Sequence, residues 1–168
     1  MADQDFAALA ARVVAMEKRI RAAEDQLEII RLLNTYGPLV DSAEGEAAAE
    51  LWVEGGHYRF LHEGELHGLK APDELAPMYG WPGHLDLVNT GVSHFTGMPQ
   101  ITLDGDTAKA VGYSYVVLKD GDQWKIWRAA VNSWDLARTD KGWRIVERVS
   151  LPLDGSTRSH DKMREVMG

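Results

Sequence analysis

The stretch from Thr107 to Leu151, TAKAVGYSYVVLKDGDQWKIWRAAVNSWDLARTDKGWRIVERVSL, decides the fold class of this chain. It divides into three runs rich in β-branched and aromatic residues, at 107–118, 123–138 and 142–151. Short turns that contain Asp and Gly separate these runs, as expected for hairpins. A fourth candidate strand, 92–103, precedes them across the turn Asp104-Gly105-Asp106. Four long strands with tight turns predict an antiparallel meander.

The part of the chain before these strands has a helical pattern. Apolar residues recur every three or four positions from Asp5 to Ala22, and the row continues through Leu27, Ile30 and Leu33. The helix either runs on or breaks near residues 23–25. So narrow an apolar row packs either against another subunit or against its own domain.

Proline and glycine predict where the later elements end. Pro38 predicts that a second helix ends near Gly37, with one further turn up to Asp41. The sequence further predicts helices at 44–53 and 71–79, a strand at 57–61 and a loop at 80–89. Helices first and a curled sheet afterwards predict an α+β fold in which the helices cover one face of the sheet.

Length and composition limit what this chain can be. Its 168 residues suit one domain at 24–155, with a helical extension at 1–23 and a polar tail at 156–168. A net charge of −8 argues against nucleic acid and anionic membranes as partners. The N-terminus is acidic and no long apolar run is present, so a cytoplasmic location is expected. The absence of cysteine excludes disulfides and cysteine nucleophiles but leaves the redox compartment undecided. Neither a glycine-rich phosphate loop nor a metal-binding motif is present, so we expect no cofactor and no metal.

Asp41 and His94 are the main candidates for catalytic residues in this sequence. Asp41 ends a helix and His94 lies at the start of a strand, so they can meet only through the fold. In an apolar cavity the carboxylate would fix the imidazole tautomer and make the histidine a general base. The alternative is a core histidine bonded to a backbone carbonyl and an ordinary capping carboxylate.

Other polar and aromatic residues are candidates for the same cavity. Tyr36 lies one turn before Asp41, where its hydroxyl either fills the core or polarises a substrate. Strand alternation places Arg128, Asn132 and Trp134 on one face, where they need partners: a ligand, an internal network or an ion pair such as one with Glu147. The six tryptophans fill the core or line a pocket for a flat ligand. The segment containing Trp81 and His84 is a candidate lid.

Three passages resemble the SnoaL-like branch of the NTF2-like superfamily. They are Tyr36–Asp41 followed by 47–52, Ser93–Thr96 leading into Leu103-Asp104-Gly105-Asp106-Thr107-Ala108, and Asn132-Ser133-Trp134 followed by Gly142-Trp143. The resemblance implies a cone made of a strongly bent antiparallel sheet closed by N-terminal helices. Within the superfamily the chain is most similar to scytalone dehydratase, hexachlorocyclohexane dehydrochlorinase and lignin-derived diarylpropane formaldehyde lyases. The dehydratase's second histidine has no clear counterpart in this sequence.

This resemblance implies a cofactor-independent lyase that acts on a hydrophobic aromatic alcohol or diol. It implies that His94 is the base, that Asp41 orients it, and that Tyr36 assists. The substrate-binding residues would be Asn132, Arg128, Tyr58, Trp52, Trp81 and Trp134. Two alternatives remain: an isomerase or cyclase in the manner of ketosteroid isomerase, and a non-enzymatic ligand-binding or dioxygenase-β-like subunit. A dimer or trimer is expected from the resemblance.

Overall fold

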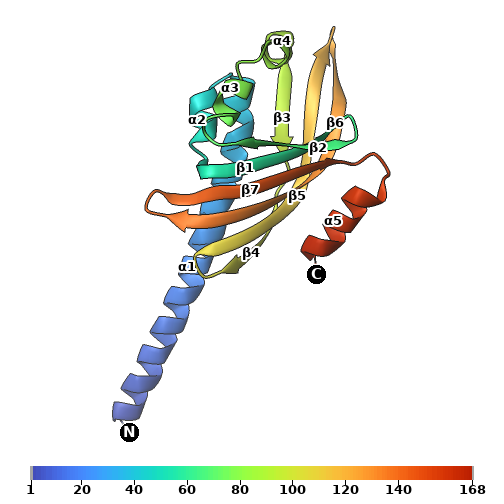
Figure 1. Cartoon of the computed structure of the whole chain (residues 1–168). Coiled ribbons are helices and arrows are strands. Elements are labelled where there is room, and N and C mark those ends of the chain that lie inside the picture. Colours follow the sequence, from blue (N-terminus) through green and yellow to red (C-terminus); the bar gives the residue numbers. More distant parts are fainter. Residues whose placement is uncertain (1, 168) are drawn as a thin grey trace.

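A computed structural model describes residues 2–167, with the side chains of 5–61 and 63–165. One long helix leads into a strongly curved sheet that is not closed into a barrel (Figure 1). The predicted α+β class is therefore confirmed. The elements are α1 (Ala2–Asp41), α2 (Gly45–Ala49), β1 (Trp52–His62), β2 (Glu65–Lys70), α3 (Leu75–Met78), α4 (Pro82–Thr90), β3 (Val92–Thr96), β4 (Gln100–Asp104), β5 (Thr107–Asp120), β6 (Gln123–Thr139), β7 (Gly142–Pro152) and α5 (Thr157–Met167).

The predicted meander is present as β5-β6-β7, within a sheet of order β2-β1-β7-β6-β5-β3. One pairing differs from the expectation, because β1 runs parallel to β7 while the other strand pairs are antiparallel. The predicted strand 92–103 is two strands, β3 and β4, and both pair with β5. Gly97-Met98-Pro99 separates them, since proline has no N–H to contribute to a ladder.

Several predicted helix boundaries are wrong. The predicted helix 44–53 stops at Ala49, because Trp52 pairs with Ile145 and starts β1. The segment 80–89, predicted to be a loop, contains α4, which has Pro82 in its first turn. The polar tail forms α5, which packs beside β5, β6 and β7. In each case tertiary pairing or packing decided a boundary that local sequence left open.

Helix α1 is continuous, and it changes the face that it buries. In its C-terminal half, residues at spacings of three and four are buried against the sheet, among them Ile29, Leu33 and Val40. Leu27 is 54% exposed and Leu33 only 2%, so the two do not share one apolar row as the sequence suggested. Pro38 does not end the helix, because Asp41 and the preceding turn are held against β3. Of the two halves of α1, it is therefore the C-terminal half that packs on the cone.

Asp25 connects α1 to the β6–β7 hairpin. Its carboxylate pairs with Arg138, which also binds Asp106, and accepts a hydrogen bond from the Trp143 indole at 3.4 Å. Burial raises the pKa of the Asp25 carboxyl. The hydrogen bonds from Arg138 and Trp143 and the charge of Arg138 outweigh burial and hold that pKa below its ordinary value of 3.8.

We expect Asp25→Asn to lower the free energy of unfolding at neutral pH by roughly 1–3 kcal/mol, because a buried charged partner is lost. Since the folded-state pKa is lowered, the advantage of the native protein over the variant is fully present above pH 3.8 and disappears as the pH falls through the lower folded value. Urea unfolding at a series of pH values measures this difference. A difference that stays constant down to pH 2 would contradict it.

Gly37 allows α1 to lie directly on β3. A Cβ built at this position would stand 2.2 Å from the backbone oxygen of His94, whereas real Cβ atoms essentially never come within 3.0 Å of a neighbour. Asp41 lies one helical turn after Gly37, so it is on the same side of α1. The glycine therefore sets the distance between the Asp41 carboxylate and His94.

Gly37→Ala should force α1 and β3 apart and lower the free energy of unfolding by about 1–3 kcal/mol. Gly83→Ala is the matched control: nothing lies within 4 Å of the added methyl, and alanine favours the helix at this position in α4. Thermal unfolding should therefore show a lower Tm for the first variant and an equal or higher Tm for the second. Equal Tm values would show that the close approach is unimportant.

Candidate active site

Asp41 and His94 are in direct contact. The Asp41 carboxylate accepts two hydrogen bonds from His94, one from the backbone N–H at 2.9 Å and one from ring Nδ1 at 2.6 Å. Because a carboxylate only accepts, Nδ1 carries the hydrogen and the neutral ring keeps its lone pair on Nε2. Nε2 has no hydrogen-bond partner among the described residues, and the two side chains are 17% and 21% exposed. Asp41 thus holds the imidazole in one tautomer and leaves its Nε2 without a partner among the described residues.

A second histidine lies beside this pair. His84, in the first turn of α4, donates a hydrogen bond from Nε2 to the Val40 carbonyl at 2.8 Å. Its ring centroid is 6.1 Å from that of His94 and 5.6 Å from that of Tyr79. The sequence suggested only a lid position for His84, because 80–89 was predicted to be a loop. Pro82 at the start of a helix was the local signal that could have corrected this.

A buried arginine, Arg148 of β7, forms a second cluster. Its Nε donates to Asn132 Oδ1 at 2.9 Å, and Asn132 Nδ2 donates to Ser114 Oγ at 2.7 Å. The guanidinium carbon lies 4.5 Å from the ring centre of Tyr36 and 4.8 Å from that of Tyr58. Among the described residues no carboxylate forms an ion pair with Arg148. The cluster is thus a buried cation held by aromatic rings and an amide.

The charges within this cluster are fixed by burial and by the cation. Burial opposes the charged form of Arg148, but the electron-rich hydroxyls of Tyr58, Tyr36 and Tyr79 outweigh it and raise the pKa of the guanidinium. Burial also raises the pKa of Tyr36, against the opposing charge of Arg148. Burial and the neighbouring Tyr36 raise the pKa of Tyr79 well above its ordinary range. Both phenols therefore stay neutral at physiological pH and act as hydrogen-bond donors.

A row of aromatic rings connects the two clusters. Tyr79 donates a hydrogen bond to the Tyr36 hydroxyl at 3.3 Å, and their ring centres are 6.3 Å apart. The His84 ring lies next to the Tyr79 ring and also next to the His94 ring. The dyad and the buried arginine thus belong to one continuous polar and aromatic region between α1, α4 and the sheet.

The other predicted site residues take different places. Trp134 is buried 5.9 Å from Arg148, and Trp52 is buried with its ring 6.1 Å from that of Tyr58. The Trp52 indole N–H is buried without a hydrogen-bond partner. Trp81 is half exposed just before α4, and the Arg128 guanidinium lies 5.8 Å from the centre of the Trp127 ring. Glu147, considered as a partner for Arg128, pairs with Arg59 instead at 3.0 Å.

Arg148 could not be found from strand alternation. Trp143 and Ile145 point inward, so simple alternation predicts that Glu147 points inward and Arg148 outward. The pairing of β6 with β7 shifts by one residue at Val146, which is exposed. This bulge reverses the alternation and turns Arg148 into the core.

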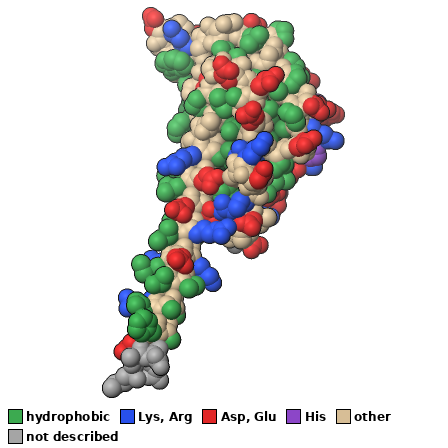
Figure 2. All heavy atoms as spheres, turned by 90° about the vertical axis from the view of Figure 1, so that its left-hand side faces the viewer, with side chains coloured by type: hydrophobic (Ala, Val, Ile, Leu, Met, Phe, Trp, Pro, Cys, Tyr) green, Lys and Arg blue, Asp and Glu red, His purple; other side chains and the backbone are tan. Residues whose placement is uncertain are grey.

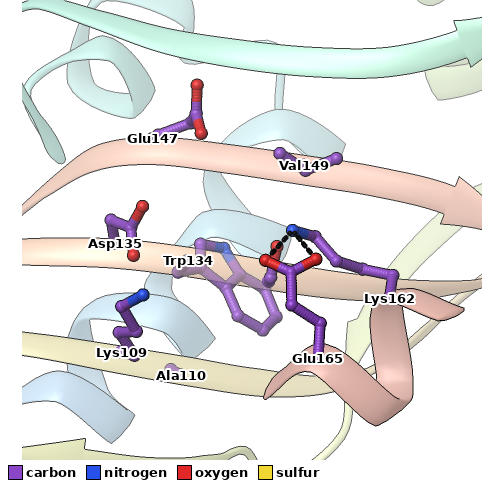
Figure 3. A pocket seen from close by; sticks show the side chains of 9 residues that line it. Lys109, Ala110, Trp134, Asp135, Glu147, Val149, Lys162 and Glu165 are labelled. Atoms are coloured by element: carbon purple, nitrogen blue, oxygen red, sulfur yellow. Dashed lines mark hydrogen bonds and ion pairs between the residues drawn. The ribbon is translucent and has the colours of Figure 1, made fainter.

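Two cavities in the structure lie away from the dyad. A small hollow of about 40 Å³ lies between α5 and the sheet, where Lys162 and Glu165 pair above Lys109, Asp135 and Glu147 (Figure 3). A larger open groove of about 1070 Å³ runs between α2, the start of β1 and the β6–β7 hairpin, and Trp52 forms part of its wall. Neither contains Asp41 or His94, so the contact between these two residues, not cavity size, identifies the candidate site.

Comparison with known proteins places the chain in a family. The model of the SnoaL-like domain matches residues 21–149. A crystal structure of an NTF2-like protein with a cystatin-like fold from Novosphingobium aromaticivorans is 36% identical, with a TM-score of 0.82 over 87% of this chain and 93% of that one. The chain therefore belongs to the SnoaL-like family, in the NTF2-like superfamily, as its sequence motifs predicted.

More distant structures share the fold alone. A proposed dehydratase of the NTF2-like family from Streptomyces avermitilis is 18% identical, with a TM-score of 0.60 over 79% of this chain and 98% of its own. The β subunit of a proposed aromatic-ring-hydroxylating dioxygenase from N. aromaticivorans is 19% identical, with a TM-score of 0.59 over 78% and 90%. No curated protein sequence matches the chain.

Two further features concern metals and membranes. Within residues 2–167 no helix has both the length and the apolar character that crossing a membrane requires. In the same part of the chain no three His, Asp or Glu side chains are grouped so that they could hold a metal ion.

The hydrogen bond between Asn132 and Arg148 should be measurable as a coupling energy. Asn132→Leu leaves the buried guanidinium without its amide partner, and Arg148→Met leaves the amide without its donor. Each single change should lower the free energy of unfolding by about 1–3 kcal/mol, and the double variant should lose clearly less than the sum. Urea unfolding of the four proteins gives the coupling. Simple additivity would show that the two side chains do not depend on each other.

Proposed function

We propose that this protein is a cofactor-independent lyase that eliminates water, or a small fragment such as formaldehyde, from a hydrophobic aromatic alcohol or diol. The observation that carries the proposal is the His94 ring, bound to Asp41 through Nδ1 and free at Nε2 among the described residues. A base fixed in this way is useful for taking a proton, and a purely structural contact between α1 and β3 would not need the unpaired Nε2.

The elimination can be written with this one base. For loss of water, Nε2 takes a proton from the carbon next to the aromatic ring, and the C–H electron pair forms the new C=C bond. The C–O bond breaks, and the imidazolium returns its proton to the leaving oxygen, which departs as water. Asp41 stabilises the imidazolium formed in between.

Loss of formaldehyde uses the same atoms of the enzyme. Nε2 takes the proton of a primary alcohol, and the O–H electron pair becomes the C=O bond of formaldehyde. The C–C bond breaks, its pair forms the alkene, and a hydroxyl on the next carbon leaves as water with the proton returned by His94. Both routes end in an alkene conjugated to an aromatic ring.

Three buried donors support an oxygen-bearing substrate. The Arg148 guanidinium has no carboxylate partner among the described residues, and the Trp52 indole N–H has no partner. Tyr36 has a raised pKa and is neutral, so its hydroxyl can donate to developing negative charge. Tyr58, Trp52 and Trp134 supply the flat apolar surface that favours an aromatic ring.

An isomerase of the ketosteroid-isomerase type would use the same dyad but return the proton to another carbon. We rank it second, because ketosteroid isomerase uses an aspartate base whereas the base here is a histidine, and because the S. avermitilis structure that shares the fold is described as a proposed dehydratase. A structural role, as suggested by the dioxygenase β subunit, would not require the free Nε2. A loss of mass distinguishes the lyase, because only the lyase releases a fragment, and formation of a product of unchanged mass distinguishes the isomerase from a subunit without activity.

The test is a panel of aromatic alcohols and diols incubated with the purified chain. Styrene- or stilbene-like absorbance should appear, and mass spectrometry should show an alkene lighter by water, or by water and formaldehyde. Products of unchanged mass would identify the isomerase instead. Absence of any reaction across the panel, with bound ligands recovered unchanged, would favour the binding module.

With a substrate in hand, His94→Ala and Asp41→Asn should each reduce kcat by about 10²- to 10⁴-fold, the range of general-base catalysis. His160→Ala and Asp161→Asn are matched controls, because both residues are exposed on α5, which packs on β5, β6 and β7 and contains neither member of the dyad, so both variants should leave turnover unchanged. Steady-state kinetics measures all four. Full turnover in His94→Ala would eliminate the proposed base.

A further inference from the structure

The first half of α1 presents an uncovered row of apolar side chains. This part of the helix extends away from the sheet (Figure 1), and apolar side chains lie along it among charged ones (Figure 2). Phe6 is 75% exposed, and the rest of the row is between 46% and 56% exposed: Leu9, Val13, Met16, Ile20 and Leu27. Large apolar side chains in one continuous line on a projecting helix mark a contact surface.

The spacing of the row is that of a coiled coil. Phe6, Val13, Ile20 and Leu27 are seven residues apart, and Leu9, Met16, Ala23 and Ile30 follow each of them by three. These are the a and d positions of an uninterrupted heptad repeat. A period of 3.5 residues keeps such a seam against a second helix over its whole length.

The row faces away from the domain to which it belongs. Successive residues of a helix are about 100° apart, so Leu27 and Ile29 point to opposite sides. Ile29 is fully buried in its own core, whereas Leu27 is exposed. Another helix can therefore lie along the row without displacing the sheet from α1.

The flanking charges favour a second copy in parallel orientation. Arg12 and Arg19 occupy g positions, and Glu17 and Glu24 occupy e positions. In a parallel pair each g residue faces the following e residue of the other helix, which puts Arg12 opposite Glu17 and Arg19 opposite Glu24. An antiparallel pair would bring arginine toward arginine and glutamate toward glutamate.

We propose that two copies of this chain associate through residues 6–27 of α1 as a parallel, two-stranded coiled coil. Val13 and Ile20 at a with Leu9 at d are the choice that favours two strands over three. The two cones then lie at the same end of the coiled coil, each on the outer side of its own helix. This inference is independent of the proposed catalytic function.

Sedimentation equilibrium of the full chain tests the association. We expect a dimer for the native protein and a monomer for Val13→Asp/Ile20→Asp, which places charges in the seam. Val14→Asp is the matched control, because Val14 is 51% exposed but lies outside the a and d positions, so that variant should remain dimeric. Unchanged thermal unfolding of the cone would show that the variants fold.

A single cysteine tests the orientation, since the chain has none of its own. Leu9→Cys should form a disulfide-linked dimer on oxidation, because equivalent d positions meet in a parallel pair, and Val14→Cys should not. A native monomer, a trimer, a dimer that survives Val13→Asp/Ile20→Asp, or a Leu9→Cys dimer that does not crosslink would each overturn the proposal.

Discussion

The close approach of the last turns of α1 to β3 is the contact on which the candidate site depends. Gly37 leaves room for the backbone oxygen of His94, and one turn later the Asp41 carboxylate reaches both the backbone N–H and the ring of that histidine. One carboxylate thus fixes the helix to the strand and orients the imidazole. The structural role and the proposed catalytic role coincide in the same pair of hydrogen bonds.

The buried Arg148 is a second constraint, of a different kind. A guanidinium in a protein core is unfavourable unless its donors are satisfied and its charge is balanced. Here one amide oxygen and the faces of Tyr36 and Tyr58 surround it, and no carboxylate of the described residues neutralises it. An arrangement of this kind leaves a net positive potential inside the cone, which is suited to a substrate that develops negative charge on oxygen.

Helix α1 combines two unrelated surfaces in one continuous element. From Asp25 onward one side of the helix packs inside the cone. The opposite side of the helix carries the heptad row, which runs from Phe6 to Leu27. The apolar row that the sequence predicts through Leu27 and Leu33 joins these two faces, so the sequence left open whether the helix packs within its domain or against another subunit. Exposure of the individual side chains separates packing within the domain from contact with a second chain.

Local sequence determined the elements whose signals are themselves local. The Asp-Gly turns set the β5-β6-β7 hairpins, and the motifs around Asp41 and His94 were enough to predict the family. Whether these two residues touch stayed open in the sequence, and the packing of α1 on β3 decided it. Tertiary structure alone decided the parallel pairing of β1 with β7, the position of His84, and the inward turn of Arg148 past the bulge at Val146. The physical reason is that strand alternation, helix ends and the position of a buried charge depend on which segment packs alongside. That segment can be far away along the chain.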